Sequence, residues 1–311
     1  MIVTVTLNAT VDRTLGVERL ARSGVLRARL VRLVPSGKGV NVSAALAALG
    51  LRSVAVGFVG RNELDLYRRA LHALGVRPRL IPLPVRTRMN TTLLWSKPRP
   101  GELHLREAGD PVGAPAFARL GKCLKQLSGP RATFVFSGSA PPDASTGILK
   151  RLLALARSGG ASVCVDTSGS GLRAAVDSRV DLIKPNEDEL AELTGMPVAT
   201  LADVLATART LLDRVETVLV SRGARGAVLV RRDGAWSASV RVPVGYAINS
   251  VGAGDAFMAG WLFARSRRRT PADCLASAVA AGAANALEPS AGVVRPGKYR
   301  ALLRDVVLKR H

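Results

Sequence analysis

The sequence predicts an α/β fold in which a mostly parallel sheet is covered by helices on both faces. Short β-branched runs alternate with helical patterns along most of the 311 residues, which is typical of this architecture. Several helical patterns stop at a glycine, where a left-handed cap ends a helix. The chain is long enough to bury a large core, and it has no low-complexity linker and no internal repeat. We therefore expect one domain over residues 1–311.

The predicted strands are short runs rich in valine and other strand-forming residues. The clearest are Ile2–Thr6, Ser53–Phe58, Thr133–Phe136, Ser162–Val165, Asp181–Ile183 and Thr217–Val220. Helical patterns between them include Asn41–Leu49, Leu64–Leu74 and Ile148–Ala156. Gly50 and Gly75 follow the first two helices and are the expected caps. Later in the chain, Ala227–Val230 and Ala235–Val240 flank Arg-Asp-Gly, which predicts a hairpin.

Two segments interrupt this alternation, over residues 12–34 and 80–108. Their central parts, Leu15–Leu33 and Leu80–Glu107, are strand-like and rich in arginine, with no good helix inside them. We interpret them as excursions from the main sheet that pair into a small accessory sheet.

The charge is the unusual bulk property, since the formal net charge is +22 and the pI is about 11.4. Such an excess attracts nucleic acid, acidic membrane surfaces and phosphorylated metabolites. Arginine replacing lysine through genomic base composition explains it equally well. Only Arg265–Arg269 forms a tight basic cluster, and no aromatic residues are interleaved for base stacking. We do not expect a nucleic-acid partner.

Cellular location is predicted from what the sequence lacks. No apolar run approaches the roughly 20 residues of a membrane helix, and the N-terminal segment MIVTVTLNATVD does not resemble a signal peptide. Cys123, Cys164 and Cys274 are widely spaced and match no metal-binding pattern. The sequence therefore predicts a cytoplasmic protein with reduced thiols and no membrane partner.

The strongest motif is NSVGAGDAF at residues 249–257, followed by the apolar helical pattern Met258–Phe263. Glycines before a helix let free backbone N–H groups face an anion, and the helix dipole adds to the attraction. Asp255 falls in the first turn of that helix. If the anion is a transferring phosphoryl group, this carboxylate can accept the proton of the attacking hydroxyl. An ordinary helix cap is the structural alternative.

A second glycine turn opens a helix at residues 35–42, PSGKGVNV. It lacks the spacing of a P-loop and is a weak signal alone. Together, the two motifs resemble the two signature regions of the PfkB carbohydrate kinases. Further blocks resemble that family in the same order: residues 8–12 (NATVD), 87–90 (TRMN), 137–142 (SGSAPP), 166–169 (DTSG), 184–189 (KPNEDE) and 221–226 (SRGARG).

Within this family the chain most resembles the branch of 1-phosphofructokinase and tagatose-6-phosphate kinase, through Lys38, Arg27 and residues 285–288 (NALE). Ser36 stands where the branch usually has glycine, and Val25 stands where some relatives carry a phosphate-binding lysine. These departures leave fructose 1-phosphate, tagatose 6-phosphate and fructose 6-phosphate open as substrates. A kinase of an unphosphorylated sugar is a more distant alternative.

The resemblance implies a ribokinase-like three-layer sandwich whose accessory sheet is a lid over the sugar, through which a homodimer can form. It implies phosphorylation of a ketohexose monophosphate by ATP, with Asp255 as the base and the N–H groups of Gly252, Ala253 and Gly254 as an anion hole. It assigns the sugar phosphate to Asp12, Gly37, Lys38, Asn41, Arg88, Asn90 and Ser139. It assigns the nucleotide to Lys184, Asn186, Ser221, Gly223, Gly226 and Asn285, with Glu189 organising Mg²⁺ through water.

Taken singly, these residues have ordinary structural explanations as surface cations, turn residues or acids at helix starts. An alternative from another class is a non-catalytic basic protein that binds anions or nucleic acid on a kinase fold. Residues 252–255 (GAGD) and 184–187 (KPNE) are intact, and a binding protein does not need the base. His72, His104 and His311 show no metal-binding spacing.

Overall fold

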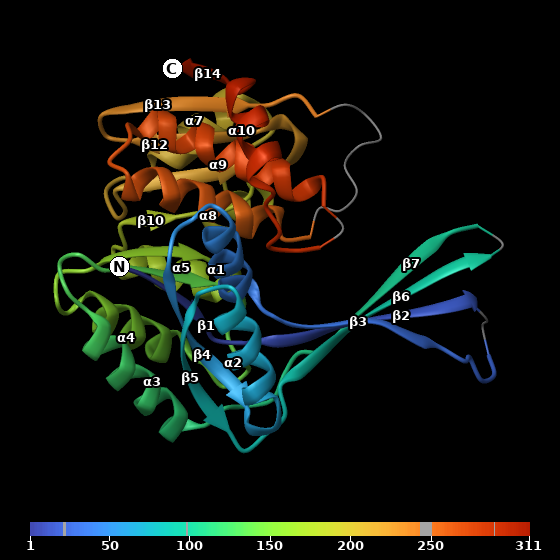
Figure 1. The fold of residues 1–311 in the computed structure, drawn as a ribbon. Helices are drawn as coiled ribbons and strands as arrows, with labels where there is room; N and C mark the ends of the chain where they lie inside the picture. The colour runs from blue at the N-terminus through green and yellow to red at the C-terminus, as the bar shows by residue number, and fades with distance from the viewer. Residues whose placement is uncertain (21–22, 98, 243–250, 289) are drawn as a thin grey trace.

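The computed structural model describes residues 1–20, 23–97, 99–242, 251–288 and 290–311. Within these ranges the strands form one ten-stranded sheet and one four-stranded sheet, and the smaller sheet projects away from the body (Figure 1). The first two residues of the motif at 249–257 lie outside the described ranges. None of the described helices is both long and apolar enough to cross a lipid bilayer.

The large sheet has the order β14-β13-β12-β11-β10-β9-β8-β1-β4-β5. Its parallel strands are β1 (Ile2–Thr6), β4 (Ser53–Gly60), β5 (Arg77–Leu83), β8 (Thr133–Ser137), β9 (Ser162–Asp166), β10 (Leu182–Ile183) and β11 (Thr217–Ser221). Antiparallel strands extend it through β12 (Ala227–Arg231), β13 (Gly234–Ser239) and β14 (Val307–Arg310). The predicted strands and hairpin are present, and Asp181 itself falls just before β10.

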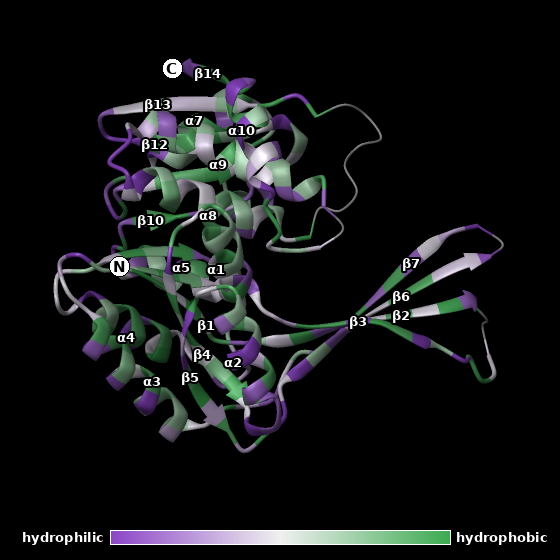
Figure 2. Ribbon diagram, viewed as in Figure 1, coloured by the Kyte–Doolittle hydropathy of each residue, from purple (hydrophilic) through white to green (hydrophobic). Residues whose placement is uncertain are grey.

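Helices cover both faces of this sheet, which makes the predicted three layers. One face packs against α3 (Ala114–Leu127), α4 (Thr146–Arg157), α5 (Gly169–Asp177), α6 (Glu187–Thr194) and α7 (Leu201–Arg209). The other packs against α1 (Lys38–Ala48), α2 (Leu64–Ala73), α8 (Ala253–Ser266), α9 (Pro271–Ala286) and α10 (Pro296–Arg304). Successive residues of a strand point to opposite faces, so Val163 and Val165 join the first core while Cys164 joins the second. The central strands are accordingly mostly hydrophobic (Figure 2).

Glycines end two of the predicted helices as expected. Gly50 and Gly75 have φ angles of 82° and 70°, in the left-handed region that favours glycine. The first helix begins earlier than predicted, at Lys38, because the backbone turns at Gly37, whose φ is 128°.

The small sheet has the order β3-β2-β6-β7 and consists of β2 (Thr10–Arg19), β3 (Arg29–Ser36), β6 (Arg88–Lys97) and β7 (Gly101–Arg106). It joins the two predicted excursions, because β2 pairs in parallel with β6 from Thr10 and Arg88 onward. The predicted boundary at residue 80 is wrong. Residues 80–83 belong to β5, an edge strand of the large sheet that pairs with β4, and its two prolines are tolerated at such an edge.

Candidate active site

The candidate site lies at the carboxyl edge of the large sheet, where parallel strands of an open α/β sheet present their loops. Asp166 ends β9, Lys184 follows β10 directly, and Ser221 ends β11. The helix α8 begins at the same edge. These elements bring together groups that lie far apart in the sequence.

Asp255 occupies the first turn of α8 and is only 3% exposed. The helix begins after Gly252, whose φ is 84° and whose Cα approaches so closely that an added Cβ would lie 2.6 Å from Ala291. Only glycine fits both conditions. Asn41 of α1 donates a 2.8 Å hydrogen bond from Nδ2 to Asp255 Oδ2, which fixes the carboxylate against the start of a second helix.

The pKa of Asp255 is raised to about 7, chiefly by burial and then by the negative charge of Asp166, while the Asn41 hydrogen bond, Lys38 and Lys184 act in the opposite direction. Desolvation disfavours the ionised form of an acid. A carboxyl group that titrates near neutrality can take up a proton from a substrate and release it again, which suits general-base catalysis.

Two lysines share the carboxylate of Asp166. Lys184 Nζ lies 3.1 Å from Asp166 Oδ1, and Lys38 Nζ lies 3.7 Å from the same oxygen. Asp166 is buried, and its Oδ2 has no hydrogen-bond partner in the described structure. Lys38 is half-exposed, and its pKa is raised, chiefly by Asp166. The two ammonium groups, with the free N–H groups at the start of α8, form a positive site beside Asp255.

Two glycines allow other parts of the chain to approach the backbone closely at this edge of the sheet. An added Cβ at Gly39 would lie 2.4 Å from Thr6 Oγ1, so α1 can begin directly against the end of β1 only without a side chain there. The aliphatic stem of Lys38 lies over Gly138, from which a Cβ would be 3.4 Å away. Lys38, predicted to meet the phosphate on the sugar, therefore lies with Asp166 and Asp255.

A second group of predicted residues lies at the root of the small sheet. Asp12 and Asn90 are opposite each other in the β2–β6 register, and Asn90 Nδ2 donates to Asp12 Oδ1 at 3.0 Å. The Oδ1 atom of Asn90 is buried and lacks a partner among the described atoms. A sugar hydroxyl is a donor that could satisfy it.

Arg88 binds the backbone at this root. Its Nη1 donates to the carbonyl of Glu107 at 2.8 Å and its Nη2 to that of Asn8 at 3.1 Å, while its Nε is buried and without a partner in the described structure. Burial lowers the pKa of this guanidinium. Two of its nitrogens are thus committed to protein carbonyls, and the fork is held rigid at the entrance of β6.

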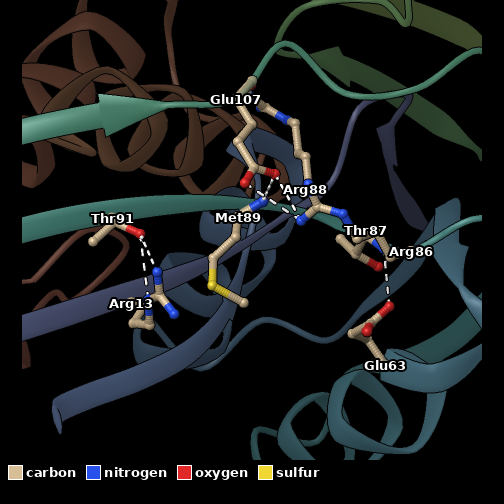
Figure 3. Close-up of polar contacts among 8 residues, drawn as sticks. All are labelled: Arg13, Glu63, Arg86, Thr87, Arg88, Met89, Thr91 and Glu107. Carbon is tan, nitrogen blue, oxygen red and sulfur yellow. Dashed lines mark hydrogen bonds and ion pairs between the residues drawn. The ribbon is translucent and has the colours of Figure 1, made fainter.

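Two carboxylates hold the start of β6, one directly after β7 and one in the body before α2 (Figure 3). Glu107 accepts the N–H of Met89 at 2.8 Å and pairs with Arg86 at 3.0 Å, and the Met89 hydrogen bond is the main cause that lowers the pKa of Glu107. Glu63 accepts the N–H of Thr87 at 2.9 Å. Sequence reasoning missed both carboxylates, because nothing local marks them.

Asn8 connects the two groups of residues and was not assigned a role from the sequence. Its Nδ2 donates to Ser139 Oγ at 3.3 Å and to the carbonyl of Ala108 at 3.0 Å, while its own carbonyl accepts from Arg88. Asn8 and Asp166 share a detectable signal, since each stands at the carboxyl end of a predicted parallel strand.

The residues predicted for the nucleotide lie on the next loops along the same edge. Asn186 caps α6 in a capping box with Glu189, whose Oε2 accepts the Asn186 N–H at 2.8 Å. Asn186 also bridges to Ser221. Gly223 and Gly226 have φ angles of 56° and 85°, and a Cβ at Gly226 would lie 2.0 Å from the carbonyl of Ala238.

Asn285 differs from the others because its side chain is fully buried. Its Nδ2 donates to the carbonyls of Ser290 at 2.8 Å and Val293 at 3.0 Å. The loop it holds contains Ala291, which packs against Gly252. Asn285 therefore holds the loop beside the start of α8.

Comparison with known proteins decides the family. The family model of pfkB family carbohydrate kinases matches residues 3–296. The 1-phosphofructokinase of Rhodobacter capsulatus is 34% identical in a match covering 99% of this chain and 97% of that protein. The chain belongs to the pfkB family of carbohydrate kinases.

Other similar proteins are named for different substrates. The 1-phosphofructokinase of Haloferax volcanii is 37% identical over 88% of this chain and 87% of its own. The ATP-dependent 6-phosphofructokinase isozyme 2 of Mycobacterium tuberculosis is 32% identical over 93% of this chain and 84% of its own. The solved structure of phosphofructokinase-2 from Escherichia coli in complex with potassium superposes with a TM-score of 0.91 at 24% identity, covering 97% and 98% of the two chains. The Arabidopsis thaliana ribokinase structure gives 0.72 at 21%, also covering 97% and 98%. The ribokinase-like fold is confirmed.

Proposed function

We propose that this pfkB kinase transfers the γ-phosphoryl group of ATP to a hydroxyl of a ketohexose monophosphate, and that fructose 1-phosphate is the preferred acceptor. The buried Asp255 carboxyl, with its pKa near 7 and its place beside Lys38, Lys184 and the start of α8, carries the proposal. Such an arrangement suits phosphoryl transfer, where catalysis is mainly positioning and charge stabilisation.

In the proposed reaction the acceptor hydroxyl donates its proton to the Asp255 carboxylate as its oxygen bonds to the γ-phosphorus and the bond to ADP breaks. The N–H groups of Gly252, Ala253 and Gly254 and the two ammonium groups stabilise the charge on the phosphoryl oxygens. Asn41 keeps the carboxylate oriented throughout.

The residues of this site fit a magnesium ion that keeps most of its water ligands. The described residues contain no group of three or more carboxylate, histidine or cysteine ligands, and magnesium in kinases commonly keeps several waters and binds the nucleotide phosphates. Glu189 lies close enough to the site to raise the pKa of Lys38, and Asp166 Oδ2 is an acceptor without a partner. These carboxylates would hold hydrated Mg²⁺, which supplies neutralisation of the phosphate charge.

The acceptor side favours a sugar that already carries a phosphate. Asp12 and Asn90 offer groups for sugar hydroxyls, and Arg88, Gly37, Asn41 and Ser139 form the rest of the proposed substrate pocket. Relatives from three organisms at 30–37% identity are named 1-phosphofructokinase. Tagatose 6-phosphate and fructose 6-phosphate are the alternative acceptors, and an unphosphorylated sugar is a more distant one.

An ADP-release assay tests this proposal. Fructose 1-phosphate, fructose 6-phosphate, tagatose 6-phosphate and fructose are compared at equal concentration with ATP and Mg²⁺. We expect the highest kcat/KM with fructose 1-phosphate and the lowest with fructose. Preference for fructose would contradict the acceptor class. No turnover with any sugar, together with salt-dependent binding of nucleic acid, would favour the non-catalytic alternative.

We further propose that the small sheet pairs with that of a second copy of this chain. Alternate positions of its strands share one face, and by register this face carries Leu15, Val17, Leu30, Leu33, Leu93, Trp95, Leu103 and Leu105. We call it the apolar face. Four of its leucines, Leu30, Leu33, Leu103 and Leu105, are 42–60% exposed, and exposed apolar patches of this kind mark interaction surfaces.

The charge distribution favours a second copy as the partner. The chain as a whole carries +22, yet within the four described strands the apolar face carries only three charged side chains by register. Arg13 donates to Thr91 Oγ1, while Arg19 and Lys97 lie at the outer end of the face, where Lys97 pairs with Glu18 at 2.6 Å. The leucines of this face are uncharged, so two identical copies can meet over them with little opposition of positive charge. The other face carries Asp12 and Asn90 and stays turned toward the sugar.

A further inference from the structure

A cavity of about 100 Å³ lies at the edge of the large sheet opposite Asp255. Its walls include Asp181 and Thr217, at the amino ends of β10 and β11, and Trp261 and Arg265 on α8. The helix α8 thus begins at the candidate active site and ends beside this cavity. Ten residues separate Asp255 from Arg265, which is about 15 Å along a helix. We call it the amino-edge cavity.

Three arginines line the amino-edge cavity, and two of them belong to the basic cluster at residues 265–269 that the proposed reaction leaves unused. The guanidinium of Arg269 has no hydrogen bond or ion pair with any described residue. Arg265 donates to Ser162 Oγ at 3.2 Å and contacts Cys164 Sγ, with no carboxylate in ion-pair distance among the described side chains. Arg231 is neutralised by Asp233 at 2.9 Å.

Two acids also line the cavity without neutralising these arginines. Asp181 accepts the N–H of Val163 at 2.8 Å, so one of its oxygens is turned to the strand. Glu216 is exposed. Neither lies within ion-pair distance of Arg265 or Arg269. The positive charge of both guanidinium groups therefore remains available.

Trp261 adds a neutral donor at the same place. Its side chain is 3% exposed, and its indole N–H has no hydrogen-bond partner within the described part of the chain. A buried donor without an acceptor is costly. Two uncompensated guanidinium groups and one unsatisfied N–H share a small cavity, and an oxyanion is the ligand that satisfies all three.

We propose that the amino-edge cavity binds a phosphate-sized oxyanion, either inorganic phosphate or the phosphoryl group of a small monoester, at a site separate from that of the reaction. Arg265 and Arg269 grip the oxyanion, and Trp261 donates to it.

Tryptophan fluorescence tests this directly, because Trp261 is itself in the cavity wall. The variant Trp95→Phe/Trp236→Phe retains Trp261 as the only tryptophan of the chain. Sodium phosphate is titrated against sodium chloride at matched ionic strength. We expect a saturable fluorescence change with phosphate and none with chloride. In the same background, Arg265→Gln and Arg269→Gln weaken phosphate binding at least tenfold. Arg269 is exposed, so its replacement leaves the core intact.

Arg268→Gln is the matched control, because Arg268 belongs to the same basic cluster but does not line the cavity. It should bind phosphate as its parent does. Equal loss in all three arginine variants, an equal response to chloride, or no saturation would each overturn the proposal. A parallel titration with glycerol phosphate separates the two sources: tighter binding than phosphate indicates a monoester, and weaker binding indicates the free ion.

Discussion

Asp255 is the residue whose environment departs most from an ordinary aspartate. It is buried at the start of a helix, next to a second buried acid and within reach of two lysines. The helix dipole and the lysines favour its charge, whereas burial and Asp166 oppose it. The balance leaves a group that changes its protonation state near neutral pH.

This balance predicts a pH-dependent stability. The pKa of Asp255 is about 7 in the folded protein and ordinarily 3.8, so the folded state binds more protons between these values. Its contribution to stability is present at low pH and is lost as pH rises toward 7. Compared with Asp255→Asn, the free energy of unfolding of the wild type should fall by up to about 1.4 kcal/mol per pH unit in that window.

Urea unfolding at pH 5, 6, 7 and 8 measures the free energy of unfolding of the wild type and of Asp255→Asn. The value for the wild type minus that for the variant should decrease between pH 5 and 7 and level off above pH 7. A difference that stays constant over the whole range would show that the pKa of Asp255 is not raised.

Arg88 carries the second prediction at this scale. Charge-assisted hydrogen bonds contribute roughly 1.5–3 kcal/mol each, so Arg88→Ala should lower kcat/KM for the sugar phosphate by about one to two decades and leave the KM for ATP nearly unchanged. Arg88→Lys should recover part of the loss, because an ammonium cannot reproduce the planar fork.

The control for this variant is Arg86→Ala, since Arg86 is exposed on the same strand entrance and pairs with the same Glu107. Steady-state kinetics with phosphorylated and unphosphorylated hexose compare the variants. If Arg88→Ala impaired both sugars equally, Arg88 would only hold the backbone carbonyls of Asn8 and Glu107.

At the scale of elements, the small sheet is held to the body at its root and is otherwise free of the large sheet (Figure 1). Arg32 of β3 also reaches Ser290, in the loop that packs against the start of α8. Hydrogen exchange should therefore show β2, β3, β6 and β7 becoming protected together when the sugar phosphate is added. Protection by ATP alone, or of only one pair of strands, would argue against a shared lid.

The apolar face gives a separate prediction on assembly. Leu33→Lys and Leu105→Lys place charges on a face that we expect to pair with its own copy, so each should shift the protein from dimer to monomer. His104→Lys is the control, because His104 lies next to Leu105 on the opposite face of β7. Light scattering after gel filtration measures the mass. A wild-type monomer, or a dimer that survives both leucine variants, would refute this interface.

Elements with strong local patterns were predictable, and those fixed by long-range pairing were not. The central strands and the glycine caps followed from β-branched runs and from glycine itself. The sequence could not separate β5 from the small sheet, because both are strand-like and arginine-rich, and only pairing with β4 decides the assignment. The pairing of β2 with β6 joins segments about 78 residues apart, for which no local signal exists.

The site was partly predictable for the same reason. Residues in recognisable glycine motifs, such as Asp255 and Lys38, could be found. Asp166 was visible only as part of a block, and its role depends on the convergence of Lys38 from the start of α1 and Lys184 from the end of β10. Glu107 and Asn8 act on backbone groups of the small sheet, and such contacts are determined by the fold as a whole.

For the whole molecule, the central claim is that a buried carboxylate at the carboxyl edge of the large sheet activates a sugar hydroxyl. Initial rates of ADP release with fructose 1-phosphate test it most directly, for the wild type, Asp255→Asn and the control Asp203→Asn, which alters an acid at the same position in the first turn of α7. Loss of general-base catalysis should lower kcat by on the order of 10²–10⁴-fold in Asp255→Asn, with ATP affinity preserved and Asp203→Asn unaffected. Near-normal turnover by Asp255→Asn would contradict the account.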